Sequence, residues 1–584
     1  MKMVIPKNTI PRQVNKGELY GDFWASWNMD LESNAGKIRV SPIPTLYTSK
    51  NDDPLFVYPT AFFRDSALYY AVCNQRIFRT LVTNLESTMF VQDIIASSPT
   101  TALSSLYSDA VSWNLGNYVS LLTDVARLFA GTWTPTWWTG TVGGAALTTG
   151  IPHPIFTGFN NLLLIGNGNV IASVNTAGSF SDARITLPLE FEVQWIRGSS
   201  TTYWIGARHK FGKEAKVFSW DGYSENFNGD YKLGSDMTFA GLVKDGVCYT
   251  VNGNGQLLAF NGGAFVEIDA LPVADTQNLF SDRSTIPAIN INKNGMEIIN
   301  GNINILVASG LASTNTIYLE NQLSGIWEYT KESGLYHKYP IVKSNVDGND
   351  FGSPAIVRAG ALFPLDKTNQ FFAGASVFTD NVTTEIGVVN IIPASNTRSK
   401  MGYFITPQIP TDNIEEIWQK VYALYTKLTN ASDYITVKYR TSRNTIITFT
   451  GDNTWVDSTH FTTTAPEFSG VAVGDEVEIL MGQGSGMSAT ITAISYSNPT
   501  YTVTITPGVT SASGSFRFRT SNWIKIDSVN ETVSTNKEFG IGANSNWIQF
   551  KTIMYGLSST SVSMINSPEI EKLIIKSDKQ IPIA

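Results

Sequence analysis

Short apolar stretches separated by Asn- and Gly-rich turns constrain the fold of this chain more than any other feature. Residues 249–268 read YTVNGNGQLLAFNGGAFVEI, with turns expected at 252–255 and 261–263. Asn and Gly tolerate the positive φ that tight hairpin turns require. The stretches between them are rich in aromatic, aliphatic and β-branched residues, as strands are. We therefore predict a three-stranded antiparallel meander, which cannot bury its own apolar face and needs neighbours.

The same pattern recurs with variations along much of the chain, at 60–79, 153–175, 203–227, 299–341 and 353–377. Several copies contain one apolar strand that ends in Gly, Ala or Ser (LLLIG, YWIGA, NILVASG, QFFAGAS). A later strand ends in an aromatic residue followed by a turn (VFSWDG, LLAFNGG, IWEYTKESG). A small residue on an inner strand lets backbones approach near an axis, and an aromatic residue on an outer strand can pack between neighbouring sheets.

Small residues on inner strands and aromatic residues on outer strands together predict an all-β chain with a β-propeller of six or seven four-stranded blades over 56–400. Residues 1–55 are predicted to be an N-terminal arm and the start of the propeller. No copy is regular enough to fix the number of blades.

From Gly402 onward the pattern changes. Residues 411–428 carry apolar residues at helical spacing, but part of the same segment suits a strand, so both interpretations stay open. Residues 433–441 alternate apolar and polar positions, which is typical of a half-buried strand. With expected partner strands at 522–526, 546–556 and 570–576, this predicts a C-terminal β-sandwich over 401–442 and 521–584.

A further unit of short alternating strands occupies 443–520. It is predicted to be a small SH3-like barrel inserted in the sandwich, because YRTSR ends before it and NWIKI resumes after it. The Gly-rich stretch 482–486 (GQGSG) lacks the Lys-Ser/Thr of a phosphate-binding loop and is predicted to be a hairpin turn.

Composition excludes several classes of function. The chain has 41 Lys and Arg against 49 Asp and Glu, a net charge of −8, and no basic cluster, so a general nucleic-acid binder is not expected. Its two cysteines, Cys73 and Cys248, are far apart in sequence and are predicted to be buried strand residues. No apolar window is long enough to span a membrane, and no signal peptide is recognised, so folding in the cytoplasm is expected.

The candidate catalytic groups do not converge in sequence. The four histidines are His153, His209, His337 and His460, none within four residues of another, which excludes short-range metal motifs. The acidic stretch 345–350 (NVDGND) is an incomplete calcium loop. A glycosidase needs two carboxyl groups that flank the scissile bond, and the carboxylates considered for that role lie in turn-like contexts: Asp221, Glu225, Asp230, Glu328 and Glu332. We predict no enzymatic activity, no metal and no cofactor.

One aromatic cluster suggests a binding role. The stretch 132–140 reads TWTPTWWTG, and its residues Trp133, Trp137 and Trp138 could stack on the faces of sugars. The alternative is that these tryptophans pack between blades or against a neighbouring subunit, and we favour it.

Four phrases of the chain resemble tailed-bacteriophage virion proteins with propeller domains, such as the nozzle protein at the distal end of short tails. They are HPIFTGFNNLLLIGNGN, ITLPLEFEVQWI, YWIGARHKFGKEAKVFSWDGYSENFNGDYKL and LSGIWEYTKESGLYHKY. The resemblance covers roughly 58–377, and the end of the chain looks like an appended sandwich of similar proteins. It carries no catalytic signature.

The resemblance implies a structural component of a virion tail, a nozzle-like ring that forms or gates the DNA exit channel. Its expected partners are other tail proteins and copies of itself in a hexameric ring, through which genome DNA passes without specific binding. Acidic groups facing the lumen would let DNA slide. The alternatives are a module that binds a host-surface receptor or glycan, and a glycan-cleaving enzyme.

Overall fold

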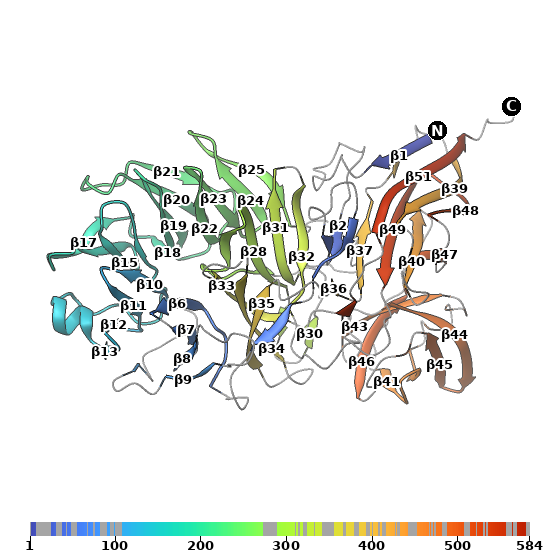
Figure 1. Cartoon of the computed structure of the whole chain (residues 1–584), viewed down its shortest axis with the longest axis horizontal. Helices are drawn as coiled ribbons and strands as arrows, with labels where there is room; N and C mark the ends of the chain where they lie inside the picture. Colours follow the sequence, from blue (N-terminus) through green and yellow to red (C-terminus); the bar gives the residue numbers. More distant parts are fainter. Residues whose placement is uncertain are drawn as a thin grey trace.

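Seven antiparallel sheets make up the larger part of the computed structural model (Figure 1). The structure describes residues 108–271 without a break. Elsewhere it describes the residues outside some short gaps and the following longer ones: 7–24, 31–37, 48–54, 82–89, 94–97, 100–107, 272–288, 319–323, 342–355, 366–369, 379–384, 393–397, 411–415, 429–432, 442–452, 482–487, 509–513, 556–562, 565–568 and 580–584.

The seven sheets are the blades of a propeller, and the strands of each blade run in order from the innermost to the outermost. Blade 1 is β6 (Ala61–Asp65), β7 (Leu68–Cys73), β8 (Arg76–Leu81) and β9 (Val91–Gln92); blade 2 is β10 (Ala110–Trp113), β11 (Gly116–Ser120), β12 (Val125–Phe129) and β13 (Thr132–Thr134); blade 3 is β14 (Ile155–Thr157), β15 (Leu163–Asn167), β16 (Val170–Val174) and β17 (Phe180–Thr186); blade 4 is β18 (Phe191–Gly198), β19 (Tyr203–His209), β20 (Ala215–Trp220) and β21 (Gly229–Lys232).

Blades 5 to 7 continue the series. Blade 5 is β22 (Thr238–Lys244), β23 (Val247–Asn252), β24 (Gln256–Phe260) and β25 (Phe265–Ala270); blade 6 is β27 (Met296–Ile299), β28 (Asn302–Ser309), β31 (Gly325–Thr330) and β32 (Gly334–Tyr339), with β26 (Ile289–Asn290) on the end of β28; blade 7 is β33 (Ile356–Pro364), β34 (Phe371–Phe378), β35 (Glu385–Ile392) and β5 (Thr45–Tyr47).

The propeller is closed by a strand from the N-terminal part of the chain. Each innermost strand contacts the innermost strand of the next blade, and β33 contacts β6 to complete the ring. The outermost strand of blade 7 is β5, which pairs with β35 through Thr45 to Tyr47. The predicted all-β propeller is thus confirmed, with seven blades. Backbone hydrogen bonds between β5 and β35 hold the N-terminal strand in the last blade.

The Asn- and Gly-rich turns connect neighbouring strands at the positions that the sequence predicts. The meander of 249–268 forms β23, β24 and β25, joined by turns in which Gly255 and Gly262 have φ of 78° and 98°. Ser66, between β6 and β7, and Gly168, between β15 and β16, also have positive φ. The predicted hairpins are confirmed at these positions.

The repeated pattern of small and aromatic residues is offset by one strand from its predicted place. The strands that contain the small residues of LLLIG and YWIGA, β15 and β19, are second in their blades, and the strands that end in aromatic residues, such as β20 and β24, are third. A Cβ built on Gly206 of β19 would lie 2.0 Å from an indole carbon of Trp195. The small residue therefore makes room for a neighbouring side chain, and not for the propeller axis.

The C-terminal sandwich consists of two antiparallel sheets at the other end of the molecule (Figure 1). The central strands of one sheet are β39 (Glu416–Tyr425) and β51 (Glu569–Lys579), flanked by β48 (Asn536–Ser545); those of the other are β49 (Trp547–Tyr555) and β40 (Tyr434–Thr441), flanked by β37 (Met401–Ile405), β38 (Ile409–Pro410) and β47 (Ile524–Val529). Residues 416–425 thus form a strand, which decides the question left open between helix and strand.

The N-terminal segment has a different place from the one predicted. Only β5 belongs to the propeller; β1 (Lys2–Pro6), β3 (Met29–Asp30) and β4 (Ile38–Val40) join the sheet of β51, and β2 (Ala25–Trp27) pairs with β37. The prediction for 1–55, an N-terminal arm and the start of the propeller, did not assign these four strands to the sandwich. They are short, and their partners lie at the opposite end of the sequence, so no local pattern marks them.

The inserted unit is a closed barrel of six strands between β40 and β47. The strands are β41 (Asn453–Trp455), β42 (His460–Thr463), β43 (Glu476–Met481), β44 (Ser488–Ser497), β45 (Thr500–Thr506) and β46 (Ser515–Thr520). The Gly-rich stretch 482–486 lies outside the described residues, between the paired strands β43 and β44.

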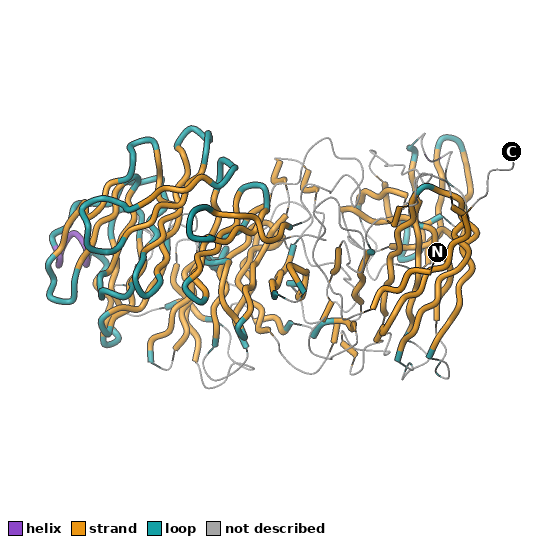
Figure 2. The backbone as a smooth tube through the Cα atoms, turned by 90° about the horizontal axis from the view of Figure 1, so that it is seen from above, coloured by secondary structure: helices purple, strands orange, loops and turns teal. Residues whose placement is uncertain are grey.

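A short π-helix, η4 (Trp137–Val142), lies at the end of the propeller farthest from the sandwich (purple in Figure 2). Among the described residues, no helix is long and apolar enough to cross a membrane. The two cysteines, Cys73 and Cys248, are buried in strands β7 and β23 and are not bonded to each other. The acidic stretch 345–350 lies outside the described residues.

Candidate functional site

A cavity of about 380 Å³ lies at the axis of the propeller, where the innermost strands of all seven blades line it. This volume is within the range of small-molecule sites. Apolar side chains form part of its walls, with Phe63, Phe156 and Phe363 among them. Polar groups also line it: Asp109, Ser112, Arg197, Asn294 and Glu297. An apolar cavity with a few convergent polar groups is the usual form of a ligand site.

Asn294 ties several blades together at this cavity. Its Nδ2 donates to Asp109 Oδ1 at 2.7 Å and to the carbonyl oxygen of Thr60 at 3.1 Å. The carboxylate of Asp109 also accepts the backbone N–H groups of Ala110 at 2.8 Å and Ile155 at 3.2 Å. Three donors thus satisfy the buried Asp109 carboxylate, and the network fixes the positions of blades 1, 2, 3 and 6 relative to one another.

Arg197 extends from β18 toward the same network. Its Nη2 donates to the carbonyl oxygen of Lys293 at 2.8 Å and to Asn294 Oδ1 at 3.2 Å, and its Nη1 donates to the carbonyl oxygen of Ile196 at 2.8 Å. A guanidinium has five N–H donors and is always charged. Within the part of the chain that the structure describes, no carboxylate forms an ion pair with Arg197. Neutral oxygens therefore hold this cation in place.

Glu297 of β27 lines the cavity two blades away from Arg197. Its Oε1 accepts the N–H of Ile298 at 2.9 Å, and no cation among the described residues forms an ion pair with it. Burial raises the pKa of the Glu297 carboxyl, while the Ile298 hydrogen bond and the charge of Arg197 act in the opposite direction. Arg197 and the carboxyl group of Glu297 thus act on each other at the cavity without direct contact.

Sequence reasoning did not identify the residues of this cavity. Arg197 stands near the end of FEVQWIRG, and Glu297 stands between apolar residues in MEII. A charged residue within an otherwise apolar strand next to the axis is a usable signal, but only once it is known which strand of each blade is innermost.

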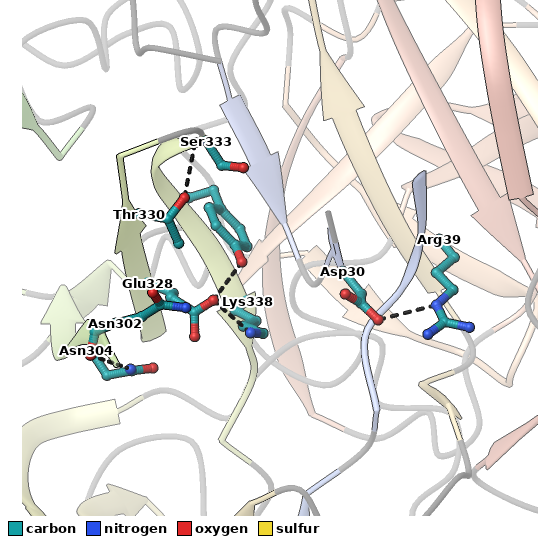
Figure 3. Close-up of polar contacts among 9 residues, drawn as sticks. Asp30, Arg39, Asn302, Asn304, Glu328, Thr330, Ser333 and Lys338 are labelled. Atoms are coloured by element: carbon teal, nitrogen blue, oxygen red, sulfur yellow. Dashed lines mark hydrogen bonds and ion pairs between the residues drawn. The ribbon is translucent and has the colours of Figure 1, made fainter. Parts of the chain in front are cut away.

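Two groups of polar contacts lie near the boundary between the propeller and the sandwich, where β32 of blade 6 contacts β2 and β3 (Figure 3). Glu328 Oε1 accepts the hydroxyl of Tyr336 and the ammonium group of Lys338, each at 2.6 Å. Burial lowers the pKa of Lys338, but the charges of Tyr339, Glu328 and Asp30 raise it by more, so the net shift is upward. Asp30 of β3 in turn accepts Arg39 Nε at 3.1 Å. The hydrogen bonds of each group lie within one module, those of Glu328 in blade 6 and that of Asp30 in the N-terminal strands.

The other carboxylates considered for catalysis are structural or lie apart. Asp221 caps a turn by accepting the N–H groups of Ser224 and Tyr223, which lowers its pKa to about 2. Asp230 pairs with Lys216 at 2.6 Å. Glu225 is exposed in the same turn, and Glu332 lies outside the described residues. The structure brings none of the described ones into the axial cavity.

The tryptophans of 132–140 lie in the interior. Trp133, Trp137 and Trp138 are 3%, 6% and 1% exposed. Trp133 Nε1 donates to Asp93 Oδ2 at 2.8 Å, and Trp138 Nε1 donates to the carbonyl oxygen of Ala145 at 2.8 Å. Their faces are covered by side chains of blades 1 to 3, so they are not available to stack on a sugar. The burial corrects the glycan-contact hypothesis and agrees with the packing alternative.

Each of the four histidines makes a hydrogen bond. His153 Nδ1 bonds the carbonyl oxygen of Gly166, His209 Nδ1 accepts the N–H of Phe211, His337 Nε2 bonds the carbonyl oxygen of Ser324, and His460 Nδ1 bonds Asp457. In the ranges that the structure describes, His, Cys, Asp and Glu do not gather in groups of three or more that could hold a metal ion.

His337 makes stability depend on pH. Burial lowers its pKa from 6.5 to about 4, whereas the unfolded chain protonates it near 6.5. The unfolded state therefore binds more protons below pH 6.5, and stability falls as the pH drops from about 6.5 to about 4, by about 3 kcal/mol in total. Urea unfolding at a series of pH values should show this slope, and His337→Gln should reduce it. His209→Gln should keep it, and equal slopes for the wild type and His337→Gln would contradict the assignment.

Comparison with known proteins finds solved structures with low TM-scores and low sequence identity to this chain. No protein-family model matches the chain, and no curated protein matches it. The WD40 β-propeller domain of Doa1 has a TM-score of 0.37 and 7% identity, over 60% of this chain and 97% of that chain. The computationally designed Ika8 protein has a TM-score of 0.33 and 9% identity, over 63% and 95%. Regucalcin from Agrobacterium tumefaciens, a calcium-binding protein, has a TM-score of 0.30 and 9% identity, over 50% and 91%.

Proposed function

We propose that the protein is a structural component of a bacteriophage tail, a nozzle-like ring of copies at the distal end that frames or gates the DNA exit channel. The proposal starts from the resemblance of 58–377 to tail proteins with propeller domains. The observation that carries it furthest is the course of the N-terminal strands. β5 completes blade 7, while β1 to β4 belong to the sandwich. One segment thus fastens both ends of the molecule, as suits a part under mechanical load.

Contacts between the modules support a mechanical role. Blade 6 contacts the N-terminal strands of the sandwich, because β32 lies against β2 and β3. The ion pair of Lys438 in β40 with Glu476 in β43 connects the sandwich to the barrel. Buried pairs of this kind need a fixed geometry. Modules held at fixed orientations suit a subunit that repeats around a ring.

The size of the axial cavity bears on the route of DNA in this proposal. A cavity of about 380 Å³ has room for a small molecule and not for a double helix. The genome would therefore pass through the lumen between copies of the protein, and not through the axis of each propeller. The net charge of −8 disfavours adhesion of DNA to that lumen.

Electron microscopy of labelled particles tests the proposal. Gold-labelled antibodies against the inserted barrel should mark the distal end of the tail in particles of the virus that encodes the protein. Native mass spectrometry of detergent-released tails should give a closed assembly of several copies of the 64.0 kDa chain. Label on the head, or absence of the chain from purified particles, would overturn the proposal.

A further inference from the structure

Arg197 and Glu297 carry opposite charges at the axial cavity and are held apart. Arg197 comes from blade 4 and Glu297 from blade 6, and β22 of blade 5 stands between their strands. Both side chains are partly buried, and neither forms an ion pair with a described residue. A charge in a partly desolvated cavity is costly unless a partner compensates it. The two side chains thus present complementary charges to whatever occupies the cavity.

Arg197 is preorganised to receive an anion. Three oxygens, the carbonyls of Ile196 and Lys293 and the Oδ1 of Asn294, hold its guanidinium in place. These contacts use three of its five N–H donors, which leaves the Nε–H and one Nη1–H for a ligand. A guanidinium fixed in this way loses little conformational freedom when it binds a carboxylate. Asp109, the other carboxylate at the cavity, already accepts three N–H donors and does not compete for it.

Glu297 is available for a cation. One of its oxygens accepts the N–H of the following residue, Ile298, and the other has no hydrogen-bond partner among the described residues. Apolar side chains line other parts of the cavity, with Phe63, Phe156 and Leu242 on three different blades. They fit a hydrocarbon group and not further charge.

We propose that the axial cavity is a binding site for a small zwitterion of amino-acid size, whose carboxylate binds Arg197 and whose ammonium group binds Glu297. The apolar walls receive its side chain. The volume of about 380 Å³ is sufficient for such a ligand and too small for a peptide of several residues. The proposal of this site does not depend on the proposed ring.

A series of ligands on the unaltered full-length protein tests the proposal. The probes are glycine, L-alanine, L-leucine and L-phenylalanine, with two analogues of leucine that each lack one charge, 4-methylpentanoate and isopentylamine. Isothermal titration calorimetry should detect at least one of the four amino acids at millimolar concentration or below. Each singly charged analogue should bind at least about tenfold more weakly than leucine, because it leaves one protein charge without a partner.

Two variants assign the contacts. Glu297→Gln and Arg197→Met should each weaken binding of the amino acid by at least about tenfold. Glu225→Gln and Arg184→Met remove the same groups outside the cavity and should leave binding unchanged. Circular dichroism checks the fold of each variant. If a variant does not fold, the ligand series on the wild-type protein still tests the proposal. Failure of all four amino acids to bind, or equal binding of leucine and its singly charged analogues, would overturn the proposal.

Discussion

Replacing Trp195 by Ala should destabilise the propeller by about 3–5 kcal/mol, the range for large aromatic side chains removed from a core. Trp195 lies on the innermost strand of blade 4, is fully buried, and donates its indole N–H to Thr238 Oγ1 at 2.9 Å. Its ring fits against two glycines, because a Cβ on Gly206 or Gly241 would lie 2.0 or 2.5 Å from ring carbons. The variant loses this packing and leaves a cavity between blades 4 and 5. Urea unfolding followed by circular dichroism measures the loss.

The location of the effect distinguishes this explanation from general damage. Hydrogen exchange should show the largest loss of protection in β19 and β22, which flank the ring. Leu115→Ala removes a side chain that is 90% exposed and should change stability by no more than about 0.5 kcal/mol. A Trp195→Ala protein as stable as the Leu115→Ala protein would show that the ring does not hold the two blades together.

Turn chemistry made most of the propeller predictable from the sequence. The Asn–Gly clusters around 249–268 determine φ at Gly255 and Gly262 by local sterics alone, so they indicate hairpins without knowledge of any partner. The alternation of apolar and polar residues in 433–441 is also a local signal, and this segment forms β40. The number of blades was not predictable, because it depends on how the last blade is completed. That strand, β5, lies more than three hundred residues before its partner β35.

The order of the strands within a blade could also not be predicted from local sequence patterns. The small residues of YWIGA were expected to let backbones approach near the axis, but Gly206 in this stretch accommodates the ring of Trp195 from the neighbouring strand. A glycine in a strand indicates a close approach without indicating by what. The same limit applied to the aromatic stretch 132–140, since a cluster of tryptophans suits a sugar site and a core equally well before burial is known.

The candidate site could not be assembled from sequence for a related reason. Asp109, Arg197, Asn294 and Glu297 come from three blades and are up to 188 residues apart, so no spacing rule connects them. Arg197 reaches Asn294 only because the ring closes β33 onto β6 and brings the seven innermost strands around one axis. Propeller geometry, and not a motif, makes them neighbours.

Removing the carboxylate of Glu476 should destabilise the junction of the barrel with the sandwich by about 3–5 kcal/mol, because it leaves a charge buried without its partner. Lys438 and Glu476 are 5% and 6% exposed and form an ion pair. In the sandwich sheet Lys438 lies opposite Lys551, which is also buried. The ammonium nitrogen of Lys551 lies 4.3 Å from the ring centroid of Tyr403. In the Glu476→Ala variant, the ammonium groups of Lys438 and Lys551 lie opposite each other, and the carboxylate of Glu476 no longer compensates the charge of Lys438.

The double variant Lys438→Met/Glu476→Met separates a charge effect from a packing effect. It removes both charges while keeping side-chain volume, so it should recover most of the stability lost in Glu476→Ala. Differential scanning calorimetry of the wild type and both variants measures this, and limited proteolysis reports release of the barrel. Lys537→Met is the control, because Lys537 pairs with the half-exposed Asp527 at 2.8 Å, and it should cost no more than about 1 kcal/mol. If the double variant is as unstable as Glu476→Ala, packing around β43 holds the barrel, and the ion pair does not.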